Sequence, residues 1–271
     1  MKGIDVSKHN GVINFSLLKD QIDFVMIRAG YGKNNIDAKL QTNVTGAKQN
    51  SLHFGFYWFS YALTKEMAYK EADYLCDIAD KYHPDFPLAY DWEYDSDKYA
   101  TKQGRKLTNS DRILFAKTFL KRVEERGYYA MNYSNVDYIK TKGFNELLND
   151  FDLWLAQWGT KEPSLNCGIW QYSTGGKLPG ITGNVDMNIS YKDYPQIIRG
   201  YTQETVDKSN KNEITEEEKQ EIISVFYEKY KAIAEKAITG YYGNGEERKR
   251  LFEKQNIDYQ IAQMFINLMV E

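Results

Sequence analysis

The sequence of 271 residues predicts an α/β protein, an irregular β/α barrel of eight strands and about five helices followed by a small three-helix bundle. Three observations lead to this prediction. Strand-like and helix-like segments alternate over the first 200 residues, as in parallel sheets covered by helices. Polar side chains gather where the predicted strands end, as at the rim of a barrel. After Tyr194 the composition becomes polar, and apolar residues then recur at helical spacing.

Eight short segments are expected to be strands because most are apolar along their whole length, as strands buried on both faces are. They are Gly3–Val6, Phe24–Ala29, His53–Ser60, Leu88–Trp92, Tyr128–Tyr133, Leu153–Trp158, Gly168–Tyr172 and Asn184–Ile189. After Leu153 they follow one another without room for helices. This helix-poor end makes the predicted barrel irregular.

Helices are expected between the earlier strands. Thr64 should cap one that runs to about Tyr82, and Thr108 or Ser110 one that ends near Gly127. Residues 37–50 and 135–148 show weaker helical patterns.

The composition excludes several classes of protein. Hydrophobic residues make up 42% and charged residues 27%, and the net charge of −3 lacks the basic patch of a nucleic-acid binder. No apolar run approaches the roughly 20 residues of a membrane span, and the first residues show no signal peptide. Cys76 and Cys167 are expected to be two buried thiols, and no metal or cofactor motif is present.

The segment Pro87–Asp95 is the strongest candidate for chemistry. Leu88, Tyr90 and Trp92 alternate with Ala89, Asp91 and Glu93, so the two acids should share one face of a strand. On a strand their Cα atoms would lie about 6.5 Å apart. Two carboxylates that close cannot both ionise freely, so the pKa of one should rise. Glycosidases use such a protonated acid to protonate a leaving oxygen.

Two other interpretations of this segment stay open at this point. One is a strand that runs into a solvated acidic loop. The other is a metal loop that includes Asp95 and Asp97, but an EF-hand needs Gly and Glu where this chain has Ser96 and Lys102.

The predicted barrel favours an active site, because residues from distant strand ends meet at its C-terminal rim. Polar residues at the predicted strand ends are Asp5, Arg28, Asp91, Glu93, Asn132, Gln157, Gln171 and Asp186. The four acids Asp5, Asp91, Glu93 and Asp186 are expected to converge there.

These motifs resemble the glycoside hydrolase family 25 lysozymes, many of which are phage endolysins. The resemblance covers residues 1 to about 194, in order and spacing. It is carried by Gly3-Ile4-Asp5-Val6-Ser7, Phe24-Val25-Met26-Ile27-Arg28-Ala29-Gly30-Tyr31-Gly32, Gly55-Phe56-Tyr57-Trp58-Phe59-Ser60-Tyr61, Tyr90-Asp91-Trp92-Glu93, Leu153-Trp154-Leu155-Ala156-Gln157-Trp158, Trp170-Gln171-Tyr172-Ser173 and Gly183-Asn184-Val185-Asp186.

The resemblance implies hydrolysis of the β-1,4 bond from N-acetylmuramic acid to N-acetylglucosamine in bacterial peptidoglycan, with net retention and without a cofactor or metal. Glu93 would be the general acid, assisted by Asp91, while Asp5 and Asp186 position the reacting sugar. The acetamido group of the substrate is the favoured nucleophile. The aromatic residues expected to face the sugar, or to be core packing instead, are Tyr31, Tyr61, Tyr133 and Trp158.

A second domain is expected beyond the barrel. Residues 1–198 are predicted to be catalytic, 199–213 a linker, and 214–271 a bundle that begins with a capping box at Thr215. Residues 232–267 resemble a CW_7 cell-wall-binding repeat through Gly243-Asn244-Gly245-Glu246-Glu247-Arg248. That resemblance implies a three-helix bundle that binds a muropeptide, with Arg248 as the candidate contact.

Two features depart from the repeat: there is one copy, and Asn256-Ile257 replaces Gly-Tyr. Helix 216–231 extends beyond it and is expected to be a linker or a homodimer surface.

Together these features predict an endolysin that is made in the host cytoplasm and acts on the cell wall. A different barrel glycosidase, namely an N-acetylglucosaminidase or chitinase, and a catalytically inactive wall-binding protein are the alternatives.

Overall fold

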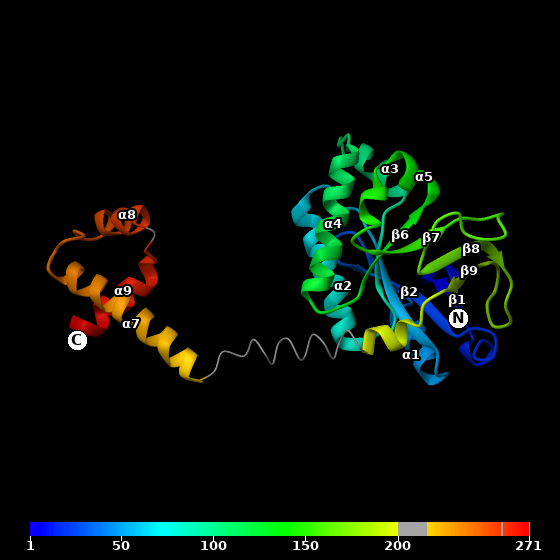
Figure 1. The fold of residues 1–271 in the computed structure, drawn as a ribbon, viewed down its shortest axis with the longest axis horizontal. Coiled ribbons are helices and arrows are strands. Elements are labelled where there is room, and N and C mark those ends of the chain that lie inside the picture. Colours follow the sequence, from blue (N-terminus) through cyan, green and yellow to red (C-terminus); the bar gives the residue numbers. More distant parts are fainter. Residues whose placement is uncertain (200–215, 256, 271) are drawn as a thin grey trace. The chain divides into compact units, whose positions relative to one another are not determined.

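A computed structural model describes residues 1–199, 216–255 and 257–270 of the chain. The chain forms two compact units, residues 1–206 and 207–271 (Figure 1). The predicted linker 199–213, apart from its first residue, and the predicted cap Thr215 lie outside the described residues.

The first unit is a closed barrel of eight strands. In spatial order they are β1 (Lys2–Val6), β2 (Phe24–Tyr31), β4 (His53–Phe59), β5 (Leu88–Asp91), β6 (Ala130–Asn135), β7 (Asp152–Ala156), β8 (Ile169–Gly176) and β9 (Val185–Ser190). The two-residue strand β3 (Asn35–Ile36) pairs with β2 only. All eight predicted strands, and the predicted barrel, are confirmed.

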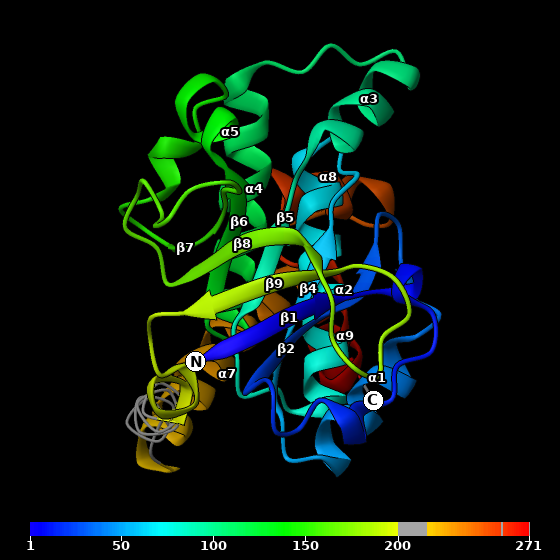
Figure 2. The ribbon, with the colours of Figure 1, turned by 90° about the vertical axis from the view of Figure 1, so that its right-hand side faces the viewer.

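The last strand runs against the others. The other seven barrel strands pair in parallel, whereas β9 lies antiparallel between β8 and β1 (Figure 2). No helix separates β8 from β9, and a short connection between neighbouring strands forces them to be antiparallel. The start of β9 therefore lies at the rim where β1 ends, and Asp186 pairs in register with Asp5.

The helices of this unit are α1 (Leu40–Gln49), α2 (Lys65–Tyr82), α3 (Tyr94–Lys102), α4 (Asn109–Glu125) and α5 (Val136–Thr141). Short 3-10 helices cover Lys8–Asn10, Phe15–Leu17 and Phe144–Leu147, and residues 194–199 are helical. Thr64 caps α2 and Thr108 caps α4, as predicted. The helix predicted over residues 135–148 is divided, because Gly143 adopts a left-handed conformation between α5 and the last 3-10 helix.

Helix α3 corrects the expectation of an acidic loop after Glu93. Glu93 is its N-cap residue, and the Glu93 amide donates to the Ser96 hydroxyl at 3.2 Å. Asp97 accepts hydrogen bonds from Trp92, Arg112 and Tyr138. Its carboxylate therefore holds α3 against α4 and α5, and the metal-loop alternative has no support here.

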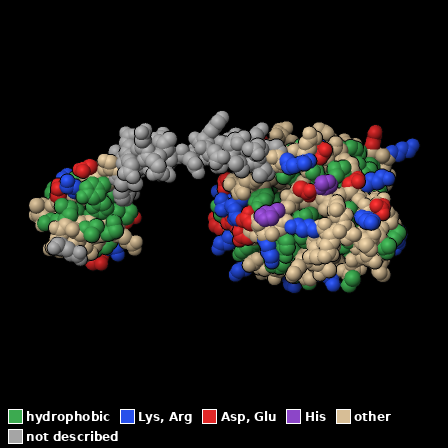
Figure 3. Space-filling view, turned by 90° about the horizontal axis from the view of Figure 1, so that it is seen from below, with side chains coloured by type: hydrophobic (Ala, Val, Ile, Leu, Met, Phe, Trp, Pro, Cys, Tyr) green, Lys and Arg blue, Asp and Glu red, His purple; other side chains and the backbone are tan. Residues whose placement is uncertain are grey.

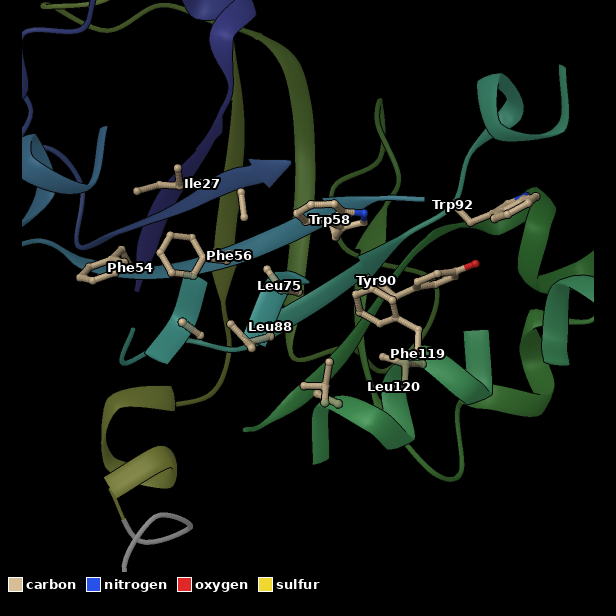
Figure 4. Close-up of a cluster of buried hydrophobic side chains, with 14 of the residues drawn as sticks. Ile27, Phe54, Phe56, Trp58, Leu75, Leu88, Tyr90, Trp92, Phe119 and Leu120 are labelled. Carbon is tan, nitrogen blue, oxygen red and sulfur yellow. The ribbon is translucent and has the colours of Figure 1, made fainter. Parts of the chain in front are cut away.

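Hydrophobic side chains form two layers around the strands. Outward-facing residues such as Trp58, Leu88 and Tyr90 pack against Leu75 of α2 and Phe119 and Leu120 of α4 (Figure 4). Inward-facing residues fill the barrel and include Phe24, Met26, Tyr57, Ala89, Met131, Trp154 and Ile169. Cys76 and Cys167 are both buried free thiols, as predicted.

Tyr194, in the helix after β9, is buried in the interior layer with Phe24 and Phe86. Its hydroxyl and that of Tyr129 both donate to Asp152 Oδ2, at 2.9 and 2.7 Å. A Cβ on Gly168 would lie 1.8 Å from the Tyr194 hydroxyl, so this position requires glycine. The segment after β9 is thus part of the barrel core.

The second unit contains α7 (Glu216–Ile238), α8 (Glu246–Lys254) and α9 (Tyr259–Val270). Its described core comprises Tyr230, Ile233, Ala234, Ala237, Tyr242, Phe252, Ala262, Phe265 and Ile266. Asp258 caps α9 by accepting from the Ile261 amide at 3.0 Å, and Gly245 is the N-cap residue of α8. Asn244 accepts a hydrogen bond from Arg248.

Within the described residues, none of the helices has the length and apolar character needed to cross a membrane.

Candidate active site

A pocket of about 180 Å³ opens at the C-terminal rim of the barrel. Four carboxyl groups line it, from Asp5 on β1, Asp91 and Glu93 at the end of β5, and Asp186 on β9. The rest of the lining is Arg28, Tyr57, Phe59, Tyr133, Trp154 and Gln171. Four acids that are far apart in the sequence thus share one small cavity.

The alternation of side chains along a strand explains this gathering. Ala89 points into the barrel, so Asp91, two residues further on, points the same way where the strand ends. Ile169 and Gln171 are related in the same way on β8. Apolar side chains therefore fill the deep interior, and the next inward positions present polar groups to the pocket.

Asp5 is held by two amide side chains. Its Oδ2 accepts from Gln171 Nε2 at 2.9 Å and from Asn188 Nδ2 at 2.8 Å. Trp154 Nε1 donates to Asn188 Oδ1 at 2.8 Å. Because an indole can only donate, it fixes the Asn188 amide with its NH₂ group toward Asp5.

Asp5 and Asp186 form a coupled pair of acids. Burial, followed by the negative charge of Asp186, raises the pKa of Asp5 to about 8, against the opposing effect of its two amide donors. Burial also raises the pKa of Asp186, although its hydrogen bond with Asp5 lowers it. The pair therefore retains a proton near neutral pH, and this proton is bound mainly by Asp5.

Asp91 and Glu93 differ in their access to the pocket. Burial, then the charges of Glu93 and Asp5, raise the pKa of Asp91 well above its usual range, while Arg28 opposes the shift. Burial also raises the pKa of Glu93, against the effect of the Tyr133 hydroxyl. The sequence predicted one raised pKa from mutual repulsion, but burial is the larger cause and both are raised. Asp91 is only 5% exposed, whereas Glu93 is half-buried and open to a ligand.

Arg28 provides positive charge beside these acids. Its Nε donates to Asp37 Oδ2 at 2.8 Å, and Asp37 also accepts from the amides of Lys8 and Lys39. The Asp37 side chain is completely buried, so the ion pair fixes the position of the Arg28 guanidinium. The sequence suggested Arg28 only as a polar residue at a strand end.

The four predicted aromatic residues lie in different surroundings. Tyr133 is buried and lines the pocket, whereas Tyr31 and Tyr61 are half-buried outside the lining and Trp158 is 54% exposed. Trp158 Nε1 and the Tyr133 hydroxyl both donate to Gln171 Oε1, at 3.3 and 3.1 Å. Both rings are therefore connected to the acids through one amide.

Gln171 and Asn188 were not among the predicted site residues. Gln171 connects Asp5, Tyr133 and Trp158, and Asn188 connects Asp5 and Trp154. The position of Gln171 at the end of a predicted strand could have indicated that it belongs to the site. Asn188 lies inside a predicted strand and gave no such signal.

Arg248, the predicted contact of the second unit, is held within its own bundle. It donates to Gly243 O at 3.1 Å, Asn244 Oδ1 at 2.9 Å and Gln263 Oε1 at 3.4 Å. These bonds use three of its five N–H groups, so two are left for a ligand. Among the described residues, no glutamate of its own helix forms an ion pair with it.

A β/α barrel with clustered acids of raised pKa at its C-terminal rim has the make-up of a glycoside hydrolase. Comparison with protein families agrees, since residues 4–181 match the glycosyl hydrolases family 25. The chain belongs to this family.

Among curated proteins, the chain is 26% identical over 191 residues to the autolytic lysozyme of Clostridium acetobutylicum, a match that covers 69% of this chain and 55% of that protein. It is 27% identical to lysozyme M1 of Streptomyces globisporus, with 69% and 67% covered. The chain thus spans little more than half of the clostridial enzyme.

Among solved structures, the catalytic domain of an endolysin from a bacteriophage of Listeria monocytogenes superposes with a TM-score of 0.61 at 25% identity, covering 74% of this chain and 97% of that domain. The lysozyme of Streptomyces coelicolor has the same fold, with a TM-score of 0.63 at 24% identity, covering 75% and 97%.

Proposed function

We propose that this chain is an endolysin-type N-acetylmuramidase that hydrolyses the β-1,4 bond between N-acetylmuramic acid and N-acetylglucosamine in peptidoglycan. The observation that carries the proposal is the arrangement of four acids in one pocket, in which the half-buried Glu93 lies next to the buried Asp91. Membership of a lysozyme-containing family supports the choice of glycan.

In the proposed mechanism, Glu93 donates a proton to the glycosidic oxygen as the bond to C1 of N-acetylmuramic acid breaks. The acetamido carbonyl oxygen of the same sugar attacks C1 from the opposite face. The Glu93 carboxylate then removes a proton from water, which opens the cyclic intermediate with net retention. The Asp5–Asp186 pair lies beside this sugar and orients its polar groups.

The test uses purified protein and peptidoglycan of defined composition. A muramidase leaves N-acetylmuramic acid at the new reducing end, whereas a glucosaminidase leaves N-acetylglucosamine there. Retention of the protein on walls without any product supports an inactive binding protein instead. Glu93→Gln is the matched control, and we expect the wild-type products to be absent from it.

We further propose that the second unit binds the cell wall. Its support is the Gly243-Asn244-Gly245 turn, which Arg248 holds by hydrogen bonds while keeping two N–H groups for a muropeptide carboxylate or carbonyl. Retention on intact walls by the Glu93→Gln protein, which cannot cut them, tests this role.

The same unit is proposed to form a homodimer. Among its described residues, Met264, Leu268 and Val270 of α9 are 51%, 65% and 68% exposed, and hydrophobic side chains gather on the face seen in Figure 3. Association of two copies would bury such a surface and raise the avidity of a single-copy binding unit. Analytical ultracentrifugation of the full chain, compared with Leu268→Glu, tests it.

A further inference from the structure

A buried carboxyl group lies behind the active site, on the outer side of the barrel. Glu71, on α2, is only 2% exposed and shares the inner face of this helix with Ala68, Ala72 and Leu75. Within the described part of the chain it has no cationic partner. Burial of an acid in apolar surroundings is costly unless hydrogen bonds compensate, so the contacts of Glu71 need an explanation.

Both oxygens of Glu71 bind the segment that follows β4. Ser60 Oγ donates to Glu71 Oε2 at 2.5 Å, and the backbone amide of Tyr61 donates to Glu71 Oε1 at 3.1 Å. Ser60 Oγ also accepts from the amide of Ala62 at 3.3 Å. One side chain thus fixes three consecutive residues of the connection between β4 and α2.

That connection touches the pocket in two ways. The amide of Ser60 donates to the carbonyl oxygen of Asp91 at 2.8 Å, directly before Trp92 and Glu93. The ring of Tyr61 packs on Phe59, which lines the pocket, at 5.1 Å between ring centroids, and on Tyr99 of α3 at 4.7 Å. A shift of residues 60–62 would therefore move the end of β5 and one aromatic wall beside the acids.

We propose that Glu71 is a positioning residue for the reaction, which holds Tyr61 and the backbone of Asp91 in place through Ser60 and the Tyr61 amide. This inference rests on the proposed muramidase activity. Burial raises the pKa of Glu71 to about 8, although the hydrogen bonds from Ser60 and the Tyr61 amide oppose this shift. A glutamine can replace it, since Oε1 would accept from the Tyr61 amide and Nε2 would donate to Ser60 Oγ.

The experiment compares three variants of the full chain on soluble peptidoglycan strands. We expect Glu71→Leu, which leaves two buried donors without acceptors, to lower kcat/KM at least ~10-fold through both a higher KM and a lower kcat. Glu71→Gln should stay within about 3-fold of wild type. Glu66→Leu, the same change at an exposed position of α2, should match wild type.

Wild-type kcat and KM in folded Glu71→Leu, or an equal loss in Glu71→Gln, would overturn the inference. If Glu71→Leu does not fold, Ser60→Ala removes one of the two contacts of Glu71. Unchanged kcat and KM in Ser60→Ala would likewise overturn the inference. Calorimetric titration of an uncut glycan oligosaccharide into the Glu93→Gln background, with and without Glu71→Leu, measures the same effect without turnover. We expect Kd to rise at least ~5-fold, and an unchanged Kd would count against the inference.

These outcomes are separate from failure of the proposed function. Wild-type protein that leaves peptidoglycan uncut refutes the muramidase, while the titration still reports on Glu71. Wild-type protein that cuts, with Glu71→Leu unaffected, refutes only the positioning role.

Discussion

Replacing Asp5 by asparagine should stabilise the catalytic unit while removing activity. Burial and the charge of Asp186 raise the pKa of Asp5 from 3.8 to about 8. An acid whose folded pKa is raised stabilises the fold fully below its unfolded pKa, and this stabilisation is lost as the pH rises through the folded pKa. Wild-type stability should therefore fall between about pH 4 and pH 8.

The size of the effect follows from these values. One pKa unit corresponds to about 1.4 kcal/mol, so the interval from 3.8 to pH 7 sets an upper limit of about 4 kcal/mol. We expect a gain of about 1–3 kcal/mol at pH 7, because Asp186 takes up part of the charge in the wild type. An asparagine oxygen can still accept from Gln171 and Asn188, and its NH₂ group can donate to Asp186.

The assay is urea unfolding followed by tryptophan fluorescence at pH 4 to 8. All five tryptophans lie at or before residue 170, so the signal reports on the first unit alone. Asp20→Asn, at an exposed position, is the control and should follow the wild-type curve. The gap between Asp5→Asn and wild type should be near zero at pH 4 and grow toward pH 8. A gap that does not change with pH, or a variant less stable than wild type at pH 8, would refute the electrostatic reasoning.

Four further outcomes are expected. Glu93→Gln should lower turnover at least ~100-fold and leave wall binding intact, and near-normal turnover would exclude it as the general acid. Asp186→Asn removes a charge that raises the pKa of Asp5, so the pH–rate profile should move to lower pH, and an unchanged profile would argue against coupling. Gln171→Leu leaves Asp5 with one donor fewer, so kcat/KM should fall about 10-fold and stability by about 1–3 kcal/mol, and wild-type values would show that the amide is dispensable. Arg248→Ala should weaken retention of the Glu93→Gln protein on walls, and equal retention at moderate salt would remove it from the binding surface.

The sequence was sufficient to predict the barrel because its strands are apolar runs. Alternation around Leu88, Tyr90 and Trp92 also placed Asp91 and Glu93 on the pocket side, although β5 ends at Asp91. The strand pattern does not indicate the reversed direction of β9, and it is this direction that brings Asp186 opposite Asp5.

Helix α3 and the hydrogen-bond network of the site could not be predicted in the same way. Residues 94–97 look like a polar loop, and their helical conformation depends on Asp97 being bound by Arg112 and Tyr138, which lie 15 and 41 positions away. Gln171 is recognisable only as a polar residue at a predicted strand end, and Asn188 and Glu71 give no local pattern. Their roles follow from contacts with residues that are distant along the chain.

The pairing of β1 with β9 has a consequence for synthesis of the protein. The amino group of Met1 donates to the carbonyl oxygen of Ser190 at 2.9 Å, so the barrel closes between its first and last strands. Asp186 follows Asp5 by 181 positions, so Asp5 leaves the ribosome long before its partner does. Contacts of such sequence separation form late, because the closure of long loops is slow. A chain that lacks β9 therefore lacks Asp186, and the pocket with its four acids is complete only when the barrel has closed.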